Sequence, residues 1–276
     1  KAVPSPEPPP ALSLELQGEL QPAPQPGMHL EPLPQENAAQ VSLLEPEAAE
    51  HRAACQQVPV LLYHDVRPGA SGENGAVVSV EEFAAQMAWL YGSGFHTITT
   101  AQLLGWLRGE QELPERPVLI TFDDGYRSVY GEAYPILKQY GLKAAVFIVT
   151  SYVGQQVGDL AYLSWDEMKE MAGSGLIEIQ AHSHNAHFLV GKEPALLTWS
   201  AAEIKRDLRK LNEAMRRAGL QAAQAYAYPY GAYDAEVQAA LRESGIKLAF
   251  TTEHGHVTSA NTAVYALPRI TIFPGD

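Results

Sequence analysis

The sequence predicts an α/β fold with a parallel sheet, from three observations. From Val58 onward, strand-like and helix-like segments alternate, an order that places helices as crossovers between parallel strands. Two strand-like segments, residues 58–63 and 118–122, are apolar enough to be buried strands. Polar side chains follow several strands directly, at the edge where α/β folds keep their functional sites. The sequence therefore predicts a site built from loops at one edge of the sheet.

The individual elements follow from apolar runs, caps and glycines. The predicted strands cover residues 58–63, 118–122, 144–149, 177–181, 223–228, 248–251 and 263–272. The predicted helices cover residues 80–90, 101–108, 129–139, 165–171, 201–218 and 234–244. Ser79 and Ser164 precede two of these helices as N-caps, because a serine hydroxyl accepts the free amide N–H groups of a first turn. Gly173 and Gly175 end the second of them, because glycine readily closes a helix.

Residues 1–57 differ in composition from the rest of the chain. They are rich in proline, glutamine and glutamate and contain no aromatic residue. Proline at this density disfavours helices and sheet ladders, so we expect a spacer of low order, with room for a short helix over residues 38–54. The folded domain is then expected over residues 58–276. Because the chain starts at Lys1 rather than Met, we expect an export signal upstream.

Charge and composition exclude several classes of protein. The formal net charge is −13, whereas a nucleic-acid-binding surface would need a basic patch. No apolar run reaches the roughly 18 residues that a membrane span needs. Cys55 is the one cysteine, which excludes an intramolecular disulfide and a cysteine-rich metal site. We interpret Cys55 as an incidental thiol, with lipid attachment as the alternative.

Two adjacent carboxylates follow a strand that is predicted to be buried. Asp123 and Asp124 stand side by side in ITFDDGYRS, where repulsion and desolvation both disfavour two negative charges. A metal ion would compensate them. Further along, His182, His184 and His187 follow another strand, and imidazole is a common ligand of zinc and similar ions. Two histidines and one carboxylate, with positions left for water, make a catalytic metal site, while a solvated His-rich loop is the alternative.

Two further segments carry candidate site residues. In AYAYPYGAYD, Pro229 and Gly231 form a tight turn that can aim the amide N–H of Tyr230 into a cleft as an oxyanion donor. In VPVLLYHDV, His64 follows a buried strand, where a histidine can serve as a general acid. The alternatives are an ordinary connection with aromatic packing for the turn, and a histidine satisfied at the end of a strand for His64.

Taken together, TFDDG, the histidine cluster and YPYG resemble the polysaccharide deacetylases of carbohydrate esterase family four, which share the NodB-homology fold. The resemblance covers about residues 58–273. It implies a distorted (β/α)7 barrel that removes acetyl groups from polysaccharides with one divalent metal ion. Zinc is the expected ion, with cobalt and nickel as alternatives.

The resemblance also implies roles by position. Asp123 matches the general base, and Asp124 matches a metal ligand. His182 and His187 match the two ligand histidines, with His184 between them as the competing candidate. Their spacing is one residue wider than the usual His-Ser/Thr-x-x-His. That wider spacing resembles the branch that deacetylates poly-β-1,6-N-acetylglucosamine.

Two other departures from the usual family pattern point to the same branch. Most of the family has an arginine that orients the base where this chain has Ala227, so the orienting group has no candidate from the resemblance. In the exopolysaccharide branch the general acid comes from an early Tyr-His pair, which His64 matches, with His254 and His256 as alternatives. Arg269 in LPRI recurs in relatives, and we expect it to form a structural salt bridge.

The function that the resemblance implies is metal-dependent N-deacetylation of poly-β-1,6-N-acetylglucosamine, a biofilm exopolysaccharide. We expect a monomer that acts on this polymer outside the cell, on the surface of a single-membrane envelope and in peripheral contact with the membrane. A periplasmic location is the alternative. Within the family, the alternative function is deacetylation of peptidoglycan or chitin. Outside enzymes, the alternative is a glycan-binding module without catalysis.

Overall fold

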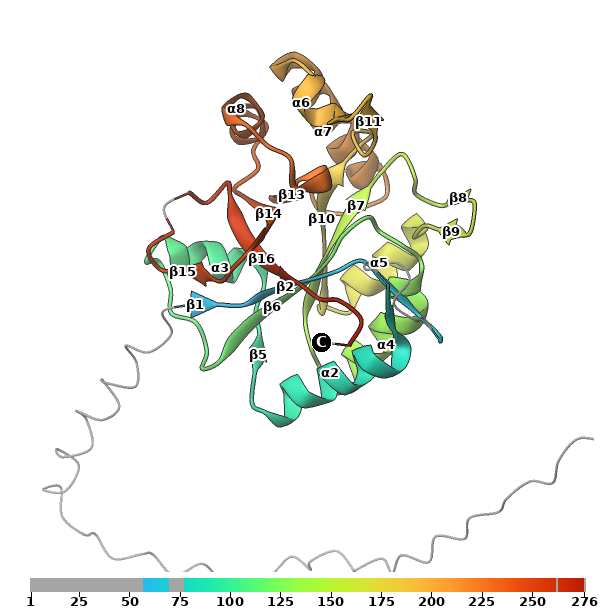
Figure 1. Ribbon diagram of the computed structural model, residues 1–276, viewed down its shortest axis with the longest axis vertical. Helices are drawn as coiled ribbons and strands as arrows, with labels where there is room; N and C mark the ends of the chain where they lie inside the picture. The colour runs from blue at the N-terminus through green and yellow to red at the C-terminus, as the bar shows by residue number, and fades with distance from the viewer. Residues whose placement is uncertain (1–56, 70–76, 262, 276) are drawn as a thin grey trace, which may run out of the picture. The chain divides into compact units, whose positions relative to one another are not determined.

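Parallel strands close into a barrel around which the helices pack (Figure 1). The computed structural model describes residues 57–69, 77–261 and 263–275. Within these residues the closed ring consists, in order of pairing, of β2 (Val60–Tyr63), β6 (Pro117–Phe122), β7 (Ala144–Val149), β10 (Ile177–Ser183), β13 (Ala225–Ala227), β14 (Leu248–His254) and β16 (Leu267–Thr271). β16 pairs with β2 and thereby closes the ring. The predicted (β/α)7 barrel is confirmed.

Each predicted strand corresponds to one strand of the barrel, although several bounds differ. Pro59 has no amide N–H, and the strand predicted over residues 58–63 divides there into β1 (Gln57–Val58) and β2. β1 pairs antiparallel with β15 (Val257–Thr258), outside the ring. The last barrel strand begins only at Leu267. Besides β15, the short strands that were not predicted are β3 (Asp65–Arg67), β4 (Val77–Ser79), β5 (His96–Thr97), β8 (Gln156–Val157), β9 (Leu160–Ala161), β11 (Leu189–Val190) and β12 (Glu193–Pro194).

The helices predicted over residues 80–244 are present, together with a short one over residues 195–198 that was not predicted, and the caps at Ser79 and Ser164 have the expected form. The helix expected within residues 38–54 lies outside the described residues. The helices are α2 (Val80–Gly92), α3 (Thr100–Leu107), α4 (Tyr134–Tyr140), α5 (Trp165–Gly173), α6 (Ala195–Thr198), α7 (Ala201–Arg217) and α8 (Ala235–Glu243). Ser79 and Ser164 accept the amide N–H groups of Glu82 and Glu167. The helix predicted over residues 129–139 opens with a π-helical turn, η2 (Val129–Ala133), ahead of Pro135, which has no N–H for a regular helical bond.

In the part of the chain that the structure describes, none of the helices combines the length and the apolar character of a membrane span.

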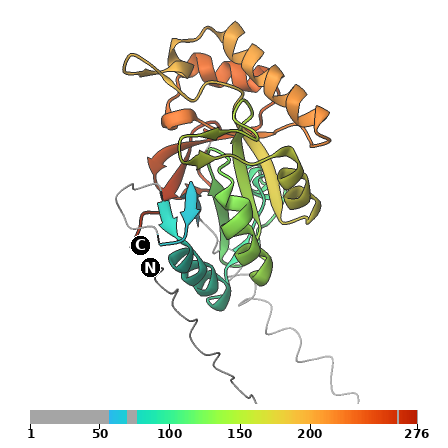
Figure 2. The same cartoon turned by 90° about the vertical axis from the view of Figure 1, so that its right-hand side faces the viewer.

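Two apolar layers lie on the two sides of the barrel wall. Because successive side chains of a strand point to opposite faces, Leu119 of β6 points inward, whereas Val118 and Ile120 point outward to the helices. The inward layer includes Leu103 and Leu104 of α3, so this helix closes one end of the barrel. α2, α4 and α5 cover one side of the barrel, and α7 and α8 pack together over another (Figures 1 and 2). The C-terminal ends of the strands lie at the end opposite α3.

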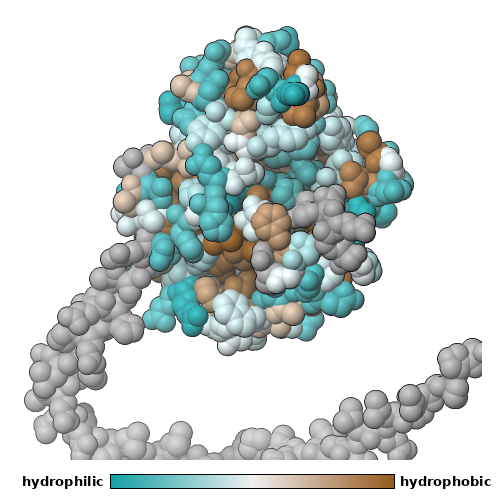
Figure 3. All heavy atoms as spheres, in the orientation of Figure 1, coloured by the Kyte–Doolittle hydropathy of each residue, from teal (hydrophilic) through white to brown (hydrophobic). Residues whose placement is uncertain are grey.

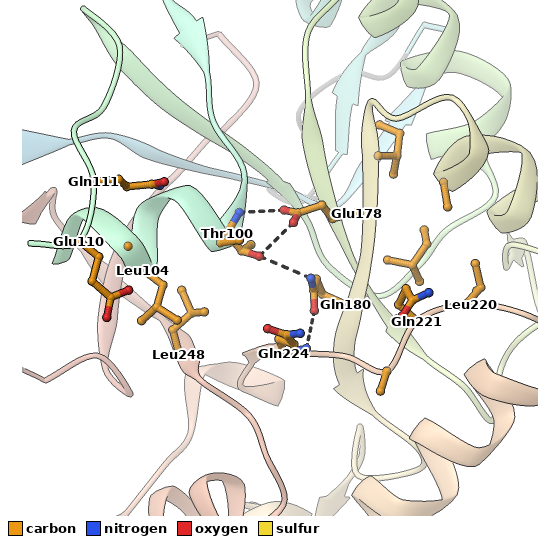
Figure 4. A pocket seen from close by; sticks show the side chains of 16 residues that line it. Thr100, Leu104, Glu110, Gln111, Glu178, Gln180, Leu220, Gln221, Gln224 and Leu248 are labelled. Carbon is orange, nitrogen blue, oxygen red and sulfur yellow. Dashed lines mark hydrogen bonds between the residues drawn. The ribbon is translucent and has the colours of Figure 1, made fainter. Parts of the chain in front are cut away.

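The pairing between neighbouring barrel strands is least extensive between β10 and β13, which pair only through Ala181 and Tyr226. On the α3 side of that pair lies a cavity of about 480 Å³ (Figure 4). Gln180 bridges the gap, because its Oε1 accepts the amide N–H groups of Gln224 and Ala225 at 2.9 and 3.0 Å. Hydrogen bonds to the Gln180 side chain therefore replace backbone hydrogen bonds between β10 and β13 on the α3 side of the pair.

Candidate active site

Asp123 and Asp124 lie in a tight turn at the C-terminal end of β6. The amide N–H of Asp123 donates to the carbonyl of Tyr63 at 3.0 Å and so continues the sheet. Asp124 and Gly125 then both adopt positive φ, of 69° and 74°. Aspartate tolerates this left-handed conformation better than most residues, and a Cβ atom on Gly125 would come within 3.1 Å of Ile148. The turn directs the two adjacent carboxylates toward different partners.

Asp123 is held by Arg269, which enters from β16. Nη1 of the arginine donates to Oδ1 at 2.9 Å, and Nη2 donates to Oδ2 at 2.7 Å. Arg269 is fully buried, lies over the rings of Phe147 and Phe250, and donates through Nε to the carbonyl of Thr251 at 2.9 Å. A planar guanidinium fixed in this way sets the orientation of the carboxylate. The expected salt bridge of Arg269 is thus formed with the candidate base itself.

The charge of Arg269 also determines the protonation of Asp123. Burial alone would raise the pKa of this carboxyl group, but the charge and hydrogen bonds of Arg269 outweigh burial and hold the pKa below its ordinary value. His182 and His64 act in the same direction. Asp123 is therefore a carboxylate at neutral pH, and each of its oxygens keeps a lone pair that the arginine does not use.

Asp124 meets two of the predicted histidines. Its Oδ1 lies 3.3 Å from Nε2 of His182 and 3.2 Å from Nε2 of His187. Among the described residues, this buried oxygen has no hydrogen-bond partner. Nδ1 of His182 lies 2.8 Å from the carbonyl of Ala227 and donates to it, so in the neutral ring Nε2 carries the lone pair. Acceptor atoms that converge in this way, within 4.8 Å of one another, fit a cation with further positions open.

His184 is turned away from this cluster. Its Nδ1 lies 2.9 Å from Oγ1 of Thr150, and its ring is outside the group of atoms around Asp124. Burial lowers the pKa of His187, which favours the neutral form that can act as a ligand. The structure therefore places His187, and not His184, beside Asp124.

His64 lies near the two carboxylates. It follows β2, is half-buried, and stands close enough to Asp123 and Asp124 to contribute to the lowering of both pKa values. His254 and His256, the alternatives for the general acid, are exposed at the end of β14 and in the residues after it. Tyr63 pairs with Phe122, so His64 and Asp123 follow neighbouring strands at the same end of the barrel, which favours His64 over the two later histidines.

The Tyr-Pro-Tyr-Gly segment forms a strained turn beside His187. η3 (Pro229–Gly231) follows β13, and Tyr230 has a positive φ of 59°. A Cβ atom on Gly231 would collide with Oγ1 of Thr252, so this position requires glycine. The ring of Tyr230 stacks on His187 with 4.6 Å between ring centroids. Strain held in place by its surroundings is characteristic of functional sites.

Three tyrosines, Tyr126, Tyr152 and Tyr162, form a cluster beside Asp124 that was not predicted from the sequence. Tyr126, directly after the Asp-Asp-Gly turn, is hydrogen-bonded to Asp124, and its pKa is raised first by burial and then by that carboxylate. Its backbone pairs with that of Tyr162. The ring of Tyr162 lies 4.9 Å from that of Tyr152, centroid to centroid. Tyr126 therefore lies at the site, beside Asp124.

Comparison with known proteins identifies the family. Residues 110–249 match the family described as "Polysaccharide deacetylase". The chain belongs to this family. The matched span contains both carboxylates, the histidines that meet Asp124 and the Tyr-Pro-Tyr-Gly turn, and it ends before Arg269.

Relatives of this polysaccharide deacetylase include enzymes of known substrate and solved structures. The poly-beta-1,6-N-acetyl-D-glucosamine N-deacetylase of Staphylococcus aureus (strain N315) is 34% identical over 197 residues, which are 71% of this chain and 67% of the relative. The structure of IcaB from Ammonifex degensii matches 79% of this chain and 92% of its own, with 28% identity and a TM-score of 0.71. The deacetylase PplD of Streptococcus pyogenes, solved with acetate, matches 79% and 93%, with 26% identity and a TM-score of 0.69.

Arg269 is the residue of this polysaccharide deacetylase whose place in the site sequence reasoning missed. The signal was present, because an arginine inside a strand of the predicted parallel sheet needs a carboxylate partner once the sheet is covered by helices. Asp123 was a carboxylate predicted to be buried, without the family's usual arginine, since Ala227 stands in that place. The arginine needed a carboxylate and the carboxylate needed a cation, and combining these two requirements would have predicted the contact between Arg269 and Asp123. The two residues are 146 positions apart in the chain, so no local sequence pattern predicts their contact.

Proposed function

We propose that this chain is a metal-dependent hydrolase that removes N-acetyl groups from poly-β-1,6-N-acetylglucosamine. The arrangement after β6 carries the proposal: Arg269 orients Asp123, and Asp124 meets His182 and His187. The S. aureus relative, which is named for this polymer, supports the choice of substrate. The wide spacing of the two histidines supports it as well. The products are acetate and a free amine on each deacetylated sugar.

The chain's own residues supply proton transfer and charge stabilisation. Asp123, ionised and oriented, accepts a proton from the attacking water. The amide N–H of Tyr230 donates to the oxyanion of the tetrahedral intermediate. His64, protonated, donates to the leaving nitrogen as the C–N bond breaks. Asp123 then releases its proton, His64 regains one from solvent, and the site returns to its starting charge.

Asp124, His182 and His187 would hold the metal ion, through the atoms that converge in the structure. When bound there, a divalent ion supplies Lewis-acid chemistry. One carboxylate and two imidazoles suit zinc, with cobalt and nickel as alternatives. The hydrogen bond from Nδ1 of His182 to a backbone carbonyl fixes the ring and its tautomer for that purpose.

Release of free amines from defined oligomers tests this function. A β-1,6-linked pentamer of N-acetylglucosamine and chitopentaose are compared, each after chelation and again with zinc, cobalt or nickel restored. We expect metal-dependent release from the β-1,6 pentamer and little from chitopentaose. Release from chitopentaose alone would assign the enzyme to chitin or peptidoglycan instead. No release from either oligomer by the metal-loaded protein would favour a glycan-binding module.

The same proposal places the enzyme outside the cell, as a monomer in peripheral contact with the membrane. Apolar side chains are exposed on two hairpins at the site end of the barrel, among them Val157 of β8 and Leu189 and Val190 of β11. Figure 3 shows apolar surface over β8–β9 and over β11 and α6. Such side chains favour contact with lipid. Sedimentation with phosphatidylcholine vesicles, by wild type and by a Leu189→Ser, Val190→Ser variant, measures that contact.

A further inference from the structure

The backbone between the two candidate ligand histidines is bound by side chains. We call residues 183–186 the histidine loop. The amide N–H of His184 donates to Oδ2 of Asp207 at 2.6 Å, and that of Asn185 donates to Oδ1 of Asp207 at 2.8 Å. The next amide, of Ala186, donates to Oγ of Ser183 at 3.1 Å. Three consecutive amide groups of the loop therefore have fixed acceptors.

Asp207 reaches the histidine loop from the buried face of α7. It is 7% exposed, and Ile204, Leu208 and Leu211 on the same face are buried apolar residues. A helix face that packs against a core ordinarily carries apolar residues, and a carboxylate there loses its hydration. The two amide hydrogen bonds offset that cost. The unusual position of Asp207 is thus explained by the loop that it binds.

The two amides bound by Asp207 lie in the middle of the loop. His182 precedes the loop and His187 follows it, with one residue more between them than in the usual family spacing. A longer loop loses more conformational entropy when it is ordered. The carbonyl of His184 is held as well, because it accepts the amide N–H of Ser151 from the end of β7 at 2.9 Å. The extra length is therefore restrained from both sides.

We propose that Asp207 is a positioning residue that holds the histidine loop in its ligand-bearing shape before a metal ion binds. This inference rests on the proposed function, because it takes His182 and His187 as metal ligands. Without the carboxylate, two loop amides would lose their acceptors, and the loop would turn to reach water. His187 would then move relative to His182. Ion binding would have to supply the ordering free energy, so the affinity would fall.

Metal affinity tests the role of Asp207 separately from catalysis. Zinc affinity is measured by competition with a chromophoric chelator, and the absorption spectrum of bound cobalt reports the ligand geometry. Asp207→Asn keeps the shape of the side chain but turns an NH2 group toward one of the two amides. We expect zinc to bind this variant about 10–100-fold more weakly, with an altered cobalt spectrum.

Lys210→Gln is the matched control for Asp207→Asn. Lys210 lies three residues further along α7, is exposed, and lines the same small pocket of about 180 Å³ as His184, Asn185 and Asp207. Its replacement removes one charge beside Asp207 and leaves the carboxylate in place. We expect wild-type zinc affinity and a wild-type cobalt spectrum from this variant.

Hydrogen exchange of the metal-free wild type is a second measurement, which does not depend on how the variant folds. The amides of His184 and Asn185 should exchange slowly before any metal is added. Rapid exchange that stops only on metal addition would overturn the inference. Wild-type zinc affinity and cobalt spectrum in Asp207→Asn, with only a lower unfolding temperature, would overturn it too. A wild-type protein that binds neither zinc nor cobalt would instead remove the proposed metal centre.

Discussion

Arg269 keeps the buried carboxyl group of Asp123 ionised, and the pH dependence of activity should show it. In Arg269→Gln the largest effect that opposes burial is lost, so the pKa of Asp123 rises. Only the ionised carboxylate accepts a proton. As the pH is lowered, the variant should therefore lose activity at a higher pH than the wild type does. The acid limb of kcat/KM should therefore move upward. Arg269→Lys keeps a charge but loses one of two hydrogen bonds, so we expect a smaller shift and about tenfold lower kcat.

Stability provides the control for these two variants. The lowered pKa of Asp123 means that the ion pair stabilises the fold above the unfolded pKa, near 4, and that this contribution disappears as the pH falls through the native pKa. Removing one member of a buried pair costs about 3–5 kcal/mol. Thermal unfolding of each variant therefore sets the temperature of its kinetic assays. An unchanged acid limb in folded Arg269→Gln would contradict the assignment.

His64 is the histidine that faces the carboxylates, and its replacement should remove acid catalysis. We expect His64→Gln to lower kcat/KM by about 10²–10⁴-fold. His254→Gln is the comparison, because His254 is exposed and its replacement should leave kcat/KM near that of the wild type. A large loss of kcat/KM in His254→Gln and none in His64→Gln would assign the role of general acid to His254 instead.

At the scale of elements, the long alternating segments were predictable from sequence, and the short ones were not. β7 was predicted with its observed bounds, because a run of apolar residues between loops leaves little choice. β8, β9, β11 and β12 each contain two residues, too few to show any periodicity. β10 runs two residues further than predicted, so His182 lies within a strand. Its pairing with neighbouring strands determines this end, and no local pattern reports that pairing.

The turn at η3 gives a prediction about a single methyl group. Gly231→Ala places a Cβ atom against Thr252 in addition to the cost of a positive φ. Gly219→Ala is the matched control, because its φ is also positive, at 82°, but nothing lies within 4 Å of the added atom. We expect about 1–2 kcal/mol of destabilisation for Gly219→Ala and more for Gly231→Ala, by urea unfolding. Only Gly231→Ala should also lose deacetylation. Equal losses would mean that the contact with Thr252 does not constrain the turn.

At the scale of the whole molecule, the candidate metal ligands Asp124, His182 and His187 belong to neither of the two apolar layers. Chelation should therefore abolish amine release without changing the far-ultraviolet circular dichroism. Zinc should raise the unfolding temperature with the logarithm of its excess, by the equivalent of about 2.7 kcal/mol at one hundred times its dissociation constant. Asp124→Asn should remove both the zinc-dependent rise and the activity. Full activity after exhaustive chelation would exclude a metal-dependent reaction.

The closing strand of the barrel has a consequence for the order in which a newly made chain becomes an enzyme. The carboxylates and the histidines around Asp124 precede β16 in the chain, whereas the arginine that orients Asp123 lies in β16, the last strand of the ring in sequence order. Until that strand inserts between β2 and β14, the barrel is open and Asp123 lacks its arginine partner. Deacetylation should therefore begin only once the ring is complete, and a chain without β16 should have no deacetylase activity.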